Sequence, residues 1–259
     1  MTINQIRLDR AATARILIAT ISVLALAHVG VSLVKNVAGY PTVYGLVPLF
    51  DLNAEQNVPT YFNASLHLFS SLLLAVIVIL KKRSHDPYAA RWTVLCYGFL
   101  FMAFDEAAGL HELMERPMQE LLGDRATGVF HFAWVIPGML IVLFFAIWFV
   151  KFLLHLPRRS MLLFLLAGGL FIGGAVGVEL FEGRHAALHG SHNLTFDTYV
   201  LVEETLEMVG LTVFIYALLG YLEEHYGEVR FRLAHSEEVA PRTTQARGQG
   251  AASGLAPVE

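Results

Sequence analysis

Long apolar segments recur along most of the chain and alternate with short polar connections. A helix that crosses a bilayer needs about 20 mostly apolar residues, because it rises about 1.5 Å per residue through a core about 30 Å thick. We therefore predict an all-α fold, a polytopic membrane helix bundle. Its six transmembrane helices are expected at about residues 15–35, 61–80, 92–111, 129–150, 160–179 and 203–222.

The basic residues predict the orientation of these helices. Most of the 18 Lys and Arg residues lie in the N-terminal segment, in the connections after the second and fourth helices, and in the C-terminal tail. Cytoplasmic segments carry such an excess, so both termini are expected in the cytoplasm (N-in/C-in) and the protein in the inner membrane, as a multi-pass protein. Residues 1–14 then form the N-terminal segment, 15–222 the transmembrane domain, and 223–259 a largely disordered tail.

Composition supports the membrane assignment and excludes several other classes. Charged residues make up 15% of the chain, against about 25% in soluble domains, and the mean hydropathy is +0.56. The net charge of −4 gives no indication of a nucleic-acid partner. The single cysteine, Cys96, excludes an intramolecular disulfide and any site with several cysteine ligands.

Ionisable residues inside the apolar segments gather near the ends that are expected to face outward. The third helix reaches across the core only if it includes Asp105 and Glu106, and the last only if it includes Glu207. If the third helix leaves the membrane near His111, Asp105 lies roughly 9 Å below the outer membrane surface. A carboxylate there costs at least about 2.5–3.5 kcal/mol, so these acids must face one another, be protonated, bind a cation or line a wet cavity. The other expected helices place His28, His67, His131 and Glu179 at the same level.

The motif FDEAAGLHE, residues 104–112, places Asp105 and Glu112 on one helical face, with His111 beside them. Asp, Glu and His are ligands suited to Zn, Fe or Mn. The alternative interpretation is a helix end whose charges are solvated by the outside loop.

The motif VEETLEMVG, residues 202–210, places Glu203 and Glu207 four residues apart on one face, with Glu204 turned about 100° away. Two such carboxylates repel unless one is protonated or a cation lies between them. They could chelate a metal, share a proton, or serve as general acid and base. Alternatively, the acids mark a helix N-terminus, where the dipole favours them.

The motif GVELFEGRHAALHGSHN, residues 177–193, includes an E-x-x-H pair of the kind found in di-iron bundles. Gly183 and Gly190 weaken a continuous helix, so the histidines are expected on an outside loop and Glu179 is the stronger ligand candidate. The histidines of this motif are His185, His189 and His192.

Two further segments have expected roles near the acids. In FDLNAEQNV, residues 50–58, the loop either folds over the mouth of the bundle and supplies Glu55, or serves only as a turn and helix cap. The small residues of AGGLFIGGAVG, residues 167–177, are expected to permit close helix packing.

The strings FDLNAEQNVPTYF, FDEAAGLHE, GVELFEG and EETLEMVG resemble an uncharacterised family of bacterial multi-pass membrane proteins, over about residues 50–222. This resemblance implies no activity. There is also a weak similarity to alkaline ceramidase-like intramembrane zinc hydrolases, in the acid-rich residues 55–65 and in His185-x-x-x-His189. Unlike in that family, the late pair precedes the last helix and a seventh span is missing.

Three functional hypotheses are compatible with this pattern. The first is a metal-dependent membrane enzyme, a hydrolase or oxidoreductase acting on a lipid-like or periplasmic substrate, with Zn, Fe or Mn as its divalent metal. The alternatives are a proton- or cation-coupled transporter and a non-catalytic scaffold subunit. The expected partners are the bilayer and a lipid or small apolar ligand, and the substrate and oligomeric state stay open. Glu106 and Glu207 are expected to be catalytic, and the expected metal ligands are Asp105, Glu106, Glu179, Glu203, Glu207, His67 and His111.

Overall fold

The computed structural model of the protein describes residues 8–123, 126–227 and 229. The described residues form helices joined by short connections, and they contain no strand. The α-helices are α1 (Arg10–Asn36), α2 (Leu46–Phe50), α3 (Val58–Arg83), α4 (Ala89–Ala108), α5 (Glu115–Leu122), α6 (Val135–His155), α7 (Arg158–Ile172), α8 (Glu179–His189) and α9 (Leu194–Tyr226). Three short 3-10 segments, η1 (Val43–Gly45), η2 (His111–Met114) and η4 (Gly128–Phe130), and one π-helical segment, η5 (Gly173–Val178), complete them.

Five of the helical stretches described are long and apolar enough to cross a membrane: α1, α3, α6, the run from α7 to α8, and α9. A sixth crossing exists if α4 and the η2–α5 segment form one span, although these two are bent by 79° at the break between them. The all-helical, membrane-type fold is therefore confirmed. The count of six and the N-in/C-in orientation stay predictions.

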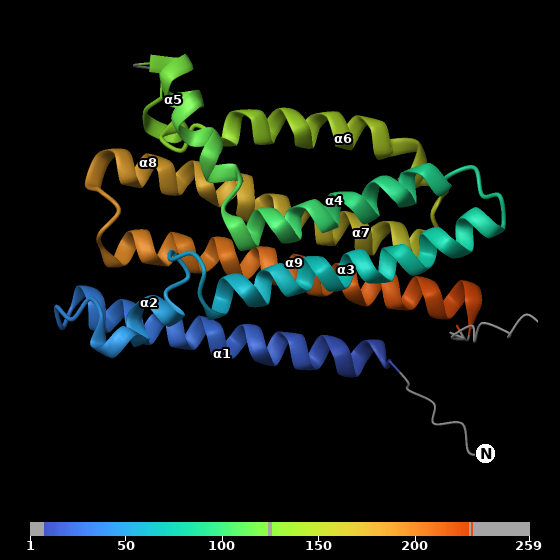
Figure 1. Ribbon diagram of the computed structural model, residues 1–259, viewed down its shortest axis with the longest axis horizontal. Coiled ribbons are helices and arrows are strands. Elements are labelled where there is room, and N and C mark those ends of the chain that lie inside the picture. The colour runs from blue at the N-terminus through green and yellow to red at the C-terminus, as the bar shows by residue number, and fades with distance from the viewer. Residues whose placement is uncertain (1–7, 124–125, 228, 230–259) are drawn as a thin grey trace, which may run out of the picture. The chain divides into compact units, whose positions relative to one another are not determined.

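Helix α9 is the element around which the others are arranged. It contacts α1, α3 and α7 along its length (Figure 1). Its side chains Met208 and Leu218 are completely buried. Helix α6 is different, because most of its side chains, such as Leu140 and Ile147, are exposed and suited to contact lipid.

Polar side chains cap the starts of α3 and α9. Asn57 accepts a hydrogen bond from the backbone N–H of Thr60 at 3.1 Å, and Pro59 occupies the first turn of α3. Asn193 accepts one from Phe196 at 3.0 Å and starts α9. Such caps satisfy backbone N–H groups that have no partner within the helix.

Several helix boundaries differ from the sequence-based expectation. The last helix begins at Leu194 instead of 203, so the interpretation of Glu203 as a helix N-terminus is wrong. The predicted outside loop is wrong for His185 and His189, because α8 continues to Gly190, where φ is +77°.

The third and fourth helices also differ from prediction. Helix α4 ends at Ala108 because Gly109 adopts φ +60°. Glu112 therefore does not share a helical face with Asp105, and the expectation that it does is wrong. Helix α6 begins at Val135, so His131 lies in the preceding connection and does not open the helix. At the C-terminus α9 extends to Tyr226, and residues 228 and 230–259 of the predicted tail lie outside the described residues.

Candidate metal centre

Three buried carboxylates converge where α8 packs against α9. One oxygen each from Glu179, Glu182 and Glu203 can be chosen so that all three lie within 4.8 Å of one another. The three residues are exposed by only 9%, 5% and 9%. Glu179 and Glu182 are three residues apart on one face of α8, and Glu203 faces them from the first third of α9. We call these residues the carboxylate trio.

The π-helical segment η5 directly precedes the trio and allows its two helices to approach closely. A Cβ atom at Gly174 would lie 2.7 Å from the carbonyl oxygen of Glu203 and 3.1 Å from Cγ of Glu207. Only glycine therefore fits at this position. The wider π turn also changes the angular position of every later side chain on α8, and such bulges are frequent at functional sites.

The hydrogen bonds of the trio leave part of it without a partner. Glu179 accepts a hydrogen bond from the indole N–H of Trp134 at 3.1 Å. Glu182 Oε2 is buried and has no hydrogen-bond partner. Among the described residues, no Lys or Arg forms an ion pair with any member of the trio. No basic side chain of the described residues is thus placed to neutralise these carboxyl groups.

A second polar group lies next to the trio, between α3, α4 and α9. The side chain of Asn63 lies against the carboxylates of Glu106 and Glu207. The Asn63 amide is within hydrogen-bonding reach of both carboxylates, although neither of its buried polar atoms meets strict hydrogen-bond geometry. His67, one turn further along α3, is 2% exposed, and its Nδ1 also has no partner. Electrostatic interactions link Glu204 and Glu207 both to Glu106 and to the trio.

Asp105 and His111 lie at the end of α4 and bind each other. Asp105 accepts hydrogen bonds from the backbone N–H of His111 at 2.7 Å and pairs with its ring Nδ1 at 3.2 Å. The carboxylate therefore closes the turn that follows Gly109. The imidazole packs against Trp134, with ring centroids 5.0 Å apart. These two residues are thus connected to the trio through the tryptophan that binds Glu179.

Glu55 lies in the loop before α3, close to Asp105, His111 and Glu112. Burial, followed by the charge of Glu112, raises the pKa of the Glu55 carboxyl above its ordinary value of 4.5, although the charge of His111 opposes the shift. The loop thus brings one more acid to this end of the bundle, as one of the two interpretations of the sequence expected. The capping interpretation also holds for this segment, through Asn57.

The Glu55→Gln variant is expected to be more stable than the wild type at neutral pH. An acid whose pKa is raised by folding destabilises the fold while it is ionised, and has no effect once it is protonated in both states, below about pH 4.5. The difference in thermal unfolding temperature between the two proteins should therefore shrink as the pH falls toward this value. Unfolding curves of the metal-free proteins would measure it, and a difference that is constant with pH would contradict the prediction.

The histidines of the 177–193 motif do not join the acids. His185 pairs through Nε2 with Oδ1 of Asn193 at 2.9 Å, and its ring stacks on His189 at a centroid distance of 4.8 Å. His192 lies in the turn before α9. Of the predicted metal ligands, Glu179 and Glu203 come together in the trio. Glu106 and Glu207 lie on either side of Asn63, whereas His67 packs against Phe99 and Phe171. Glu182 completes the trio although the sequence analysis did not select it, and its E-x-x-E spacing with Glu179 was the available signal.

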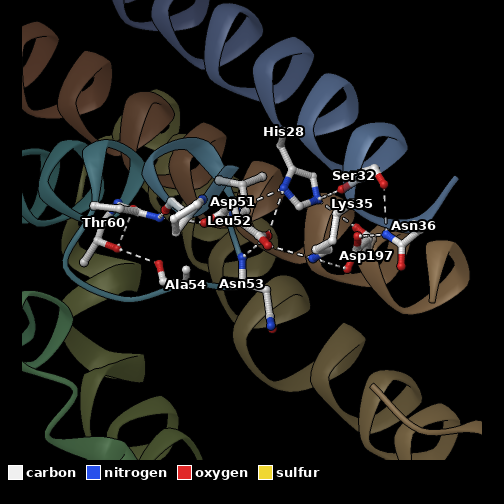
Figure 2. Close-up of polar contacts among 12 residues, drawn as sticks. His28, Ser32, Lys35, Asn36, Asp51, Leu52, Asn53, Ala54, Thr60 and Asp197 are labelled. Atoms are coloured by element: carbon white, nitrogen blue, oxygen red, sulfur yellow. Dashed lines mark hydrogen bonds and ion pairs between the residues drawn. The ribbon is translucent and has the colours of Figure 1, made fainter. Parts of the chain in front are cut away.

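A separate polar network joins α1, the α2 loop and α9 (Figure 2). Lys35 donates hydrogen bonds to Asp51 at 2.7 Å and to Asp197 at 3.1 Å. Asn36 donates to the second oxygen of Asp197 at 2.7 Å. His28 Nδ1 accepts from the backbone N–H of Leu52 at 3.0 Å, so the ring proton lies on Nε2, which donates to the carbonyl of Asp197 at 3.1 Å.

This network is satisfied internally, and its role is to hold the α2 loop, which continues to Glu55, against the bundle. The Asp197→Ala variant is expected to lower the free energy of unfolding by about 2–4 kcal/mol, because it removes two hydrogen bonds to a buried charge. Chemical unfolding in detergent would measure the change. Glu120→Ala, which breaks an exposed pair with Arg116, is the control and should cost less than about 1 kcal/mol. Equal losses of unfolding free energy in the two variants would contradict the structural role given to this network.

Comparison with known proteins identifies the family but no activity. No curated protein and no solved structure gives a significant match to this chain. The resemblance to ceramidase-like hydrolases thus has no support from known relatives. A family model described as a domain of unknown function (DUF8692) matches residues 16–222, which include all of the carboxylate trio. The chain therefore belongs to this DUF8692 family.

Proposed function

We propose that the protein is a metal-dependent membrane enzyme whose divalent cation is bound by Glu179, Glu182 and Glu203. The observation that carries this proposal is the convergence of three buried carboxylates within 4.8 Å, without a basic partner in the described chain. A buried carboxylate costs several kcal/mol unless it is compensated. Three of them can be ionised together only if a cation lies between them.

The trio also resembles a metal site in its chemistry. Carboxylate oxygens are hard ligands that suit Mn, Mg and Fe better than Zn, which favours His and Cys. Glu179 is oriented by the indole N–H of Trp134, as second partners orient ligands in metal sites. The unpartnered oxygen of Glu182 is free to bind a cation. This ligand set favours Mn2+ or Fe2+ among the metals expected from the sequence.

A metal in this position would supply Lewis acidity to a bound substrate or water. Proton transfer would then fall to the chain's own side chains. Glu207 and Glu106 lie next to the trio and are the acids placed to accept or donate a proton. Because the site lies within membrane-type helices, lipid-like molecules are the substrates with most direct access to it. Both hydrolysis and oxidation are compatible with this arrangement.

Elemental analysis of the protein purified in detergent tests the proposal. We expect at least one Mn or Fe per chain in the wild type, and a loss of at least one ion in Glu182→Gln, which keeps the size of the side chain but removes its charge. Glu120→Gln, at an exposed position with 69% side-chain exposure, should keep the full content. Sub-stoichiometric metal in the wild type would overturn the proposal and favour three acids that share protons, as a proton-coupled carrier or a scaffold subunit would require.

A further inference from the structure

The first turn of α4 meets the last turns of α6 through aromatic side chains (Figure 1). Tyr88, which directly precedes α4, stacks on His155 with ring centroids 4.4 Å apart. The guanidinium group of Arg91 lies over two rings, because its Cζ atom is 5.2 Å from the ring centroid of Tyr88 and 5.4 Å from that of Trp148 on α6. The faces of aromatic rings attract cations, and arginine stacks on them. The two rings therefore hold this guanidinium group in place.

The charge of Arg91 has no acidic partner in the described chain. Its Nε atom is enclosed and has no hydrogen-bond partner, and none of the ion pairs among the described residues includes this side chain. Asp86, the nearest acid along the chain, is already engaged: it accepts hydrogen bonds from Lys81 and from the backbone N–H of Tyr88, each at 2.8 Å. A guanidinium group has five N–H donors and no acceptor. Arg91 is thus placed to receive an anionic acceptor from outside the chain.

A second unpaired cation lies beside Arg91. Lys151 is three residues after Trp148 on α6, so the two side chains are neighbours on one helical face. Lys151 is exposed and forms no ion pair with an acid of the described chain. Arg159, in the first turn of α7, is different because it pairs with Glu224 at 3.1 Å. The positive charge that stays uncompensated is therefore found where α4 and α6 meet.

Exposed apolar side chains continue from this point along both helices. Tyr97 and Phe101 are exposed on α4, and Phe144 and Ile147 are exposed on α6. In a helix bundle of the membrane type, such side chains are suited to contact hydrocarbon. In the predicted N-in/C-in orientation, this end of the bundle faces the cytoplasmic leaflet, which carries anionic lipids, and basic pockets between helices on that side bind their headgroups.

We propose that Arg91 and Lys151 bind the phosphate group of an anionic phospholipid, whose acyl chains lie along the exposed apolar side chains of α4 and α6. The planar guanidinium group can donate two parallel hydrogen bonds to a phosphate, and the stacked rings orient it for this purpose. The site is separate from the proposed metal centre. Trp134, which binds Glu179, lies roughly 20 Å from Trp148 along α6, so the proposal does not depend on the metal.

Native mass spectrometry of the full-length protein, stripped of lipid in detergent, tests this site. The probes are phosphatidylglycerol, which is anionic, and phosphatidylcholine, which is zwitterionic. We expect the wild type to retain one phosphatidylglycerol and to bind phosphatidylcholine at least about tenfold more weakly. Arg91→Gln should weaken phosphatidylglycerol binding at least about tenfold, because it removes a charge-assisted pair of hydrogen bonds. Arg116→Gln is the matched control, because it makes the same charge change at a side chain that is 89% exposed, and it should bind as the wild type does.

Lys151→Gln provides a second variant whose folding is not in question, because this side chain is exposed. It should also weaken phosphatidylglycerol binding, whereas the unfolding temperature without lipid should stay that of the wild type. Equal binding of the two lipids by the wild type would overturn the proposal, and so would wild-type binding of phosphatidylglycerol in both variants.

Inorganic phosphate alone separates a lipid from a soluble phosphate as the occupant. Bound phosphatidylglycerol should raise the unfolding temperature of the wild type but not that of Arg91→Gln, and inorganic phosphate should raise neither. A rise with inorganic phosphate that equals the rise with the lipid and is lost in Arg91→Gln would overturn the lipid assignment in favour of a soluble phosphate.

Discussion

Replacing Gly210 with leucine is expected to force α7 and α9 apart and to lower the free energy of unfolding by more than about 3 kcal/mol. A Cβ atom at this position would lie 2.8 Å from the backbone nitrogen of Phe171 and 2.9 Å from the carbonyl oxygen of Ala167. Both are backbone atoms, so they cannot rotate away as the end of a side chain would. The larger side chain can be accommodated only if the two helices separate.

Gly169→Leu is the matched control for this substitution. Gly169 lies in α7 itself, is exposed, and has no heavy atom within 4 Å of a Cβ built on it. Leucine there should be neutral or stabilising, because glycine is about 1 kcal/mol less favourable than alanine inside a helix. Thermal or chemical unfolding in detergent compares the two variants. If Gly210→Leu unfolds at the same temperature or denaturant concentration as Gly169→Leu, the inferred close contact between α7 and α9 is wrong.

The Glu203→Lys variant is expected to lose metal affinity by at least about 100-fold while keeping the fold. Loss of a partner that only orients a ligand already costs 10–100-fold in affinity, and here a ligand itself is replaced. The new ammonium group would lie near the carboxylates of Glu179 and Glu182 and would compensate their charges. The unfolding temperature should therefore fall little, although the cation is displaced.

Isothermal titration calorimetry of Mn2+ binding to the metal-free protein measures the change in affinity. Glu120→Lys is the control, because it makes the same charge change at an exposed residue of α5 and should leave binding unchanged. Glu203→Gln provides a second variant that removes the charge without adding one, and it should also weaken binding. Wild-type affinity in both Glu203 variants would contradict the role given to this carboxylate.

The helical, membrane-type fold could be predicted from the sequence because long apolar runs have few alternatives in a bilayer, where every backbone polar group must be paired internally. The last helix was also expected to begin early enough to include its acids, while their depth in a bilayer stays a prediction. Helix α9 begins at Leu194, so Glu203 and Glu207 lie well inside it. The glycine-rich run before Glu179 was expected to permit close packing, and Gly174 shows that it does.

Other features had no local signal in the sequence. The sharp end of α4 depends on Gly109 adopting φ +60°, and a glycine within a helical pattern does not show whether it ends the helix. The contact between Lys35 and Asp197 joins residues 162 positions apart in the chain, and helix periodicity carries no information about such a pair. The π segment that precedes Glu179, which packs against α9, likewise had no local signal.

A density map of the purified protein, with anomalous scattering recorded at the Mn and Fe absorption edges, tests the central claim most directly. The account predicts an anomalous peak between the carboxylates of Glu179, Glu182 and Glu203, with oxygen atoms as its nearest protein neighbours. A map in which the three carboxyl groups bind one another directly, with no peak between them, would contradict it.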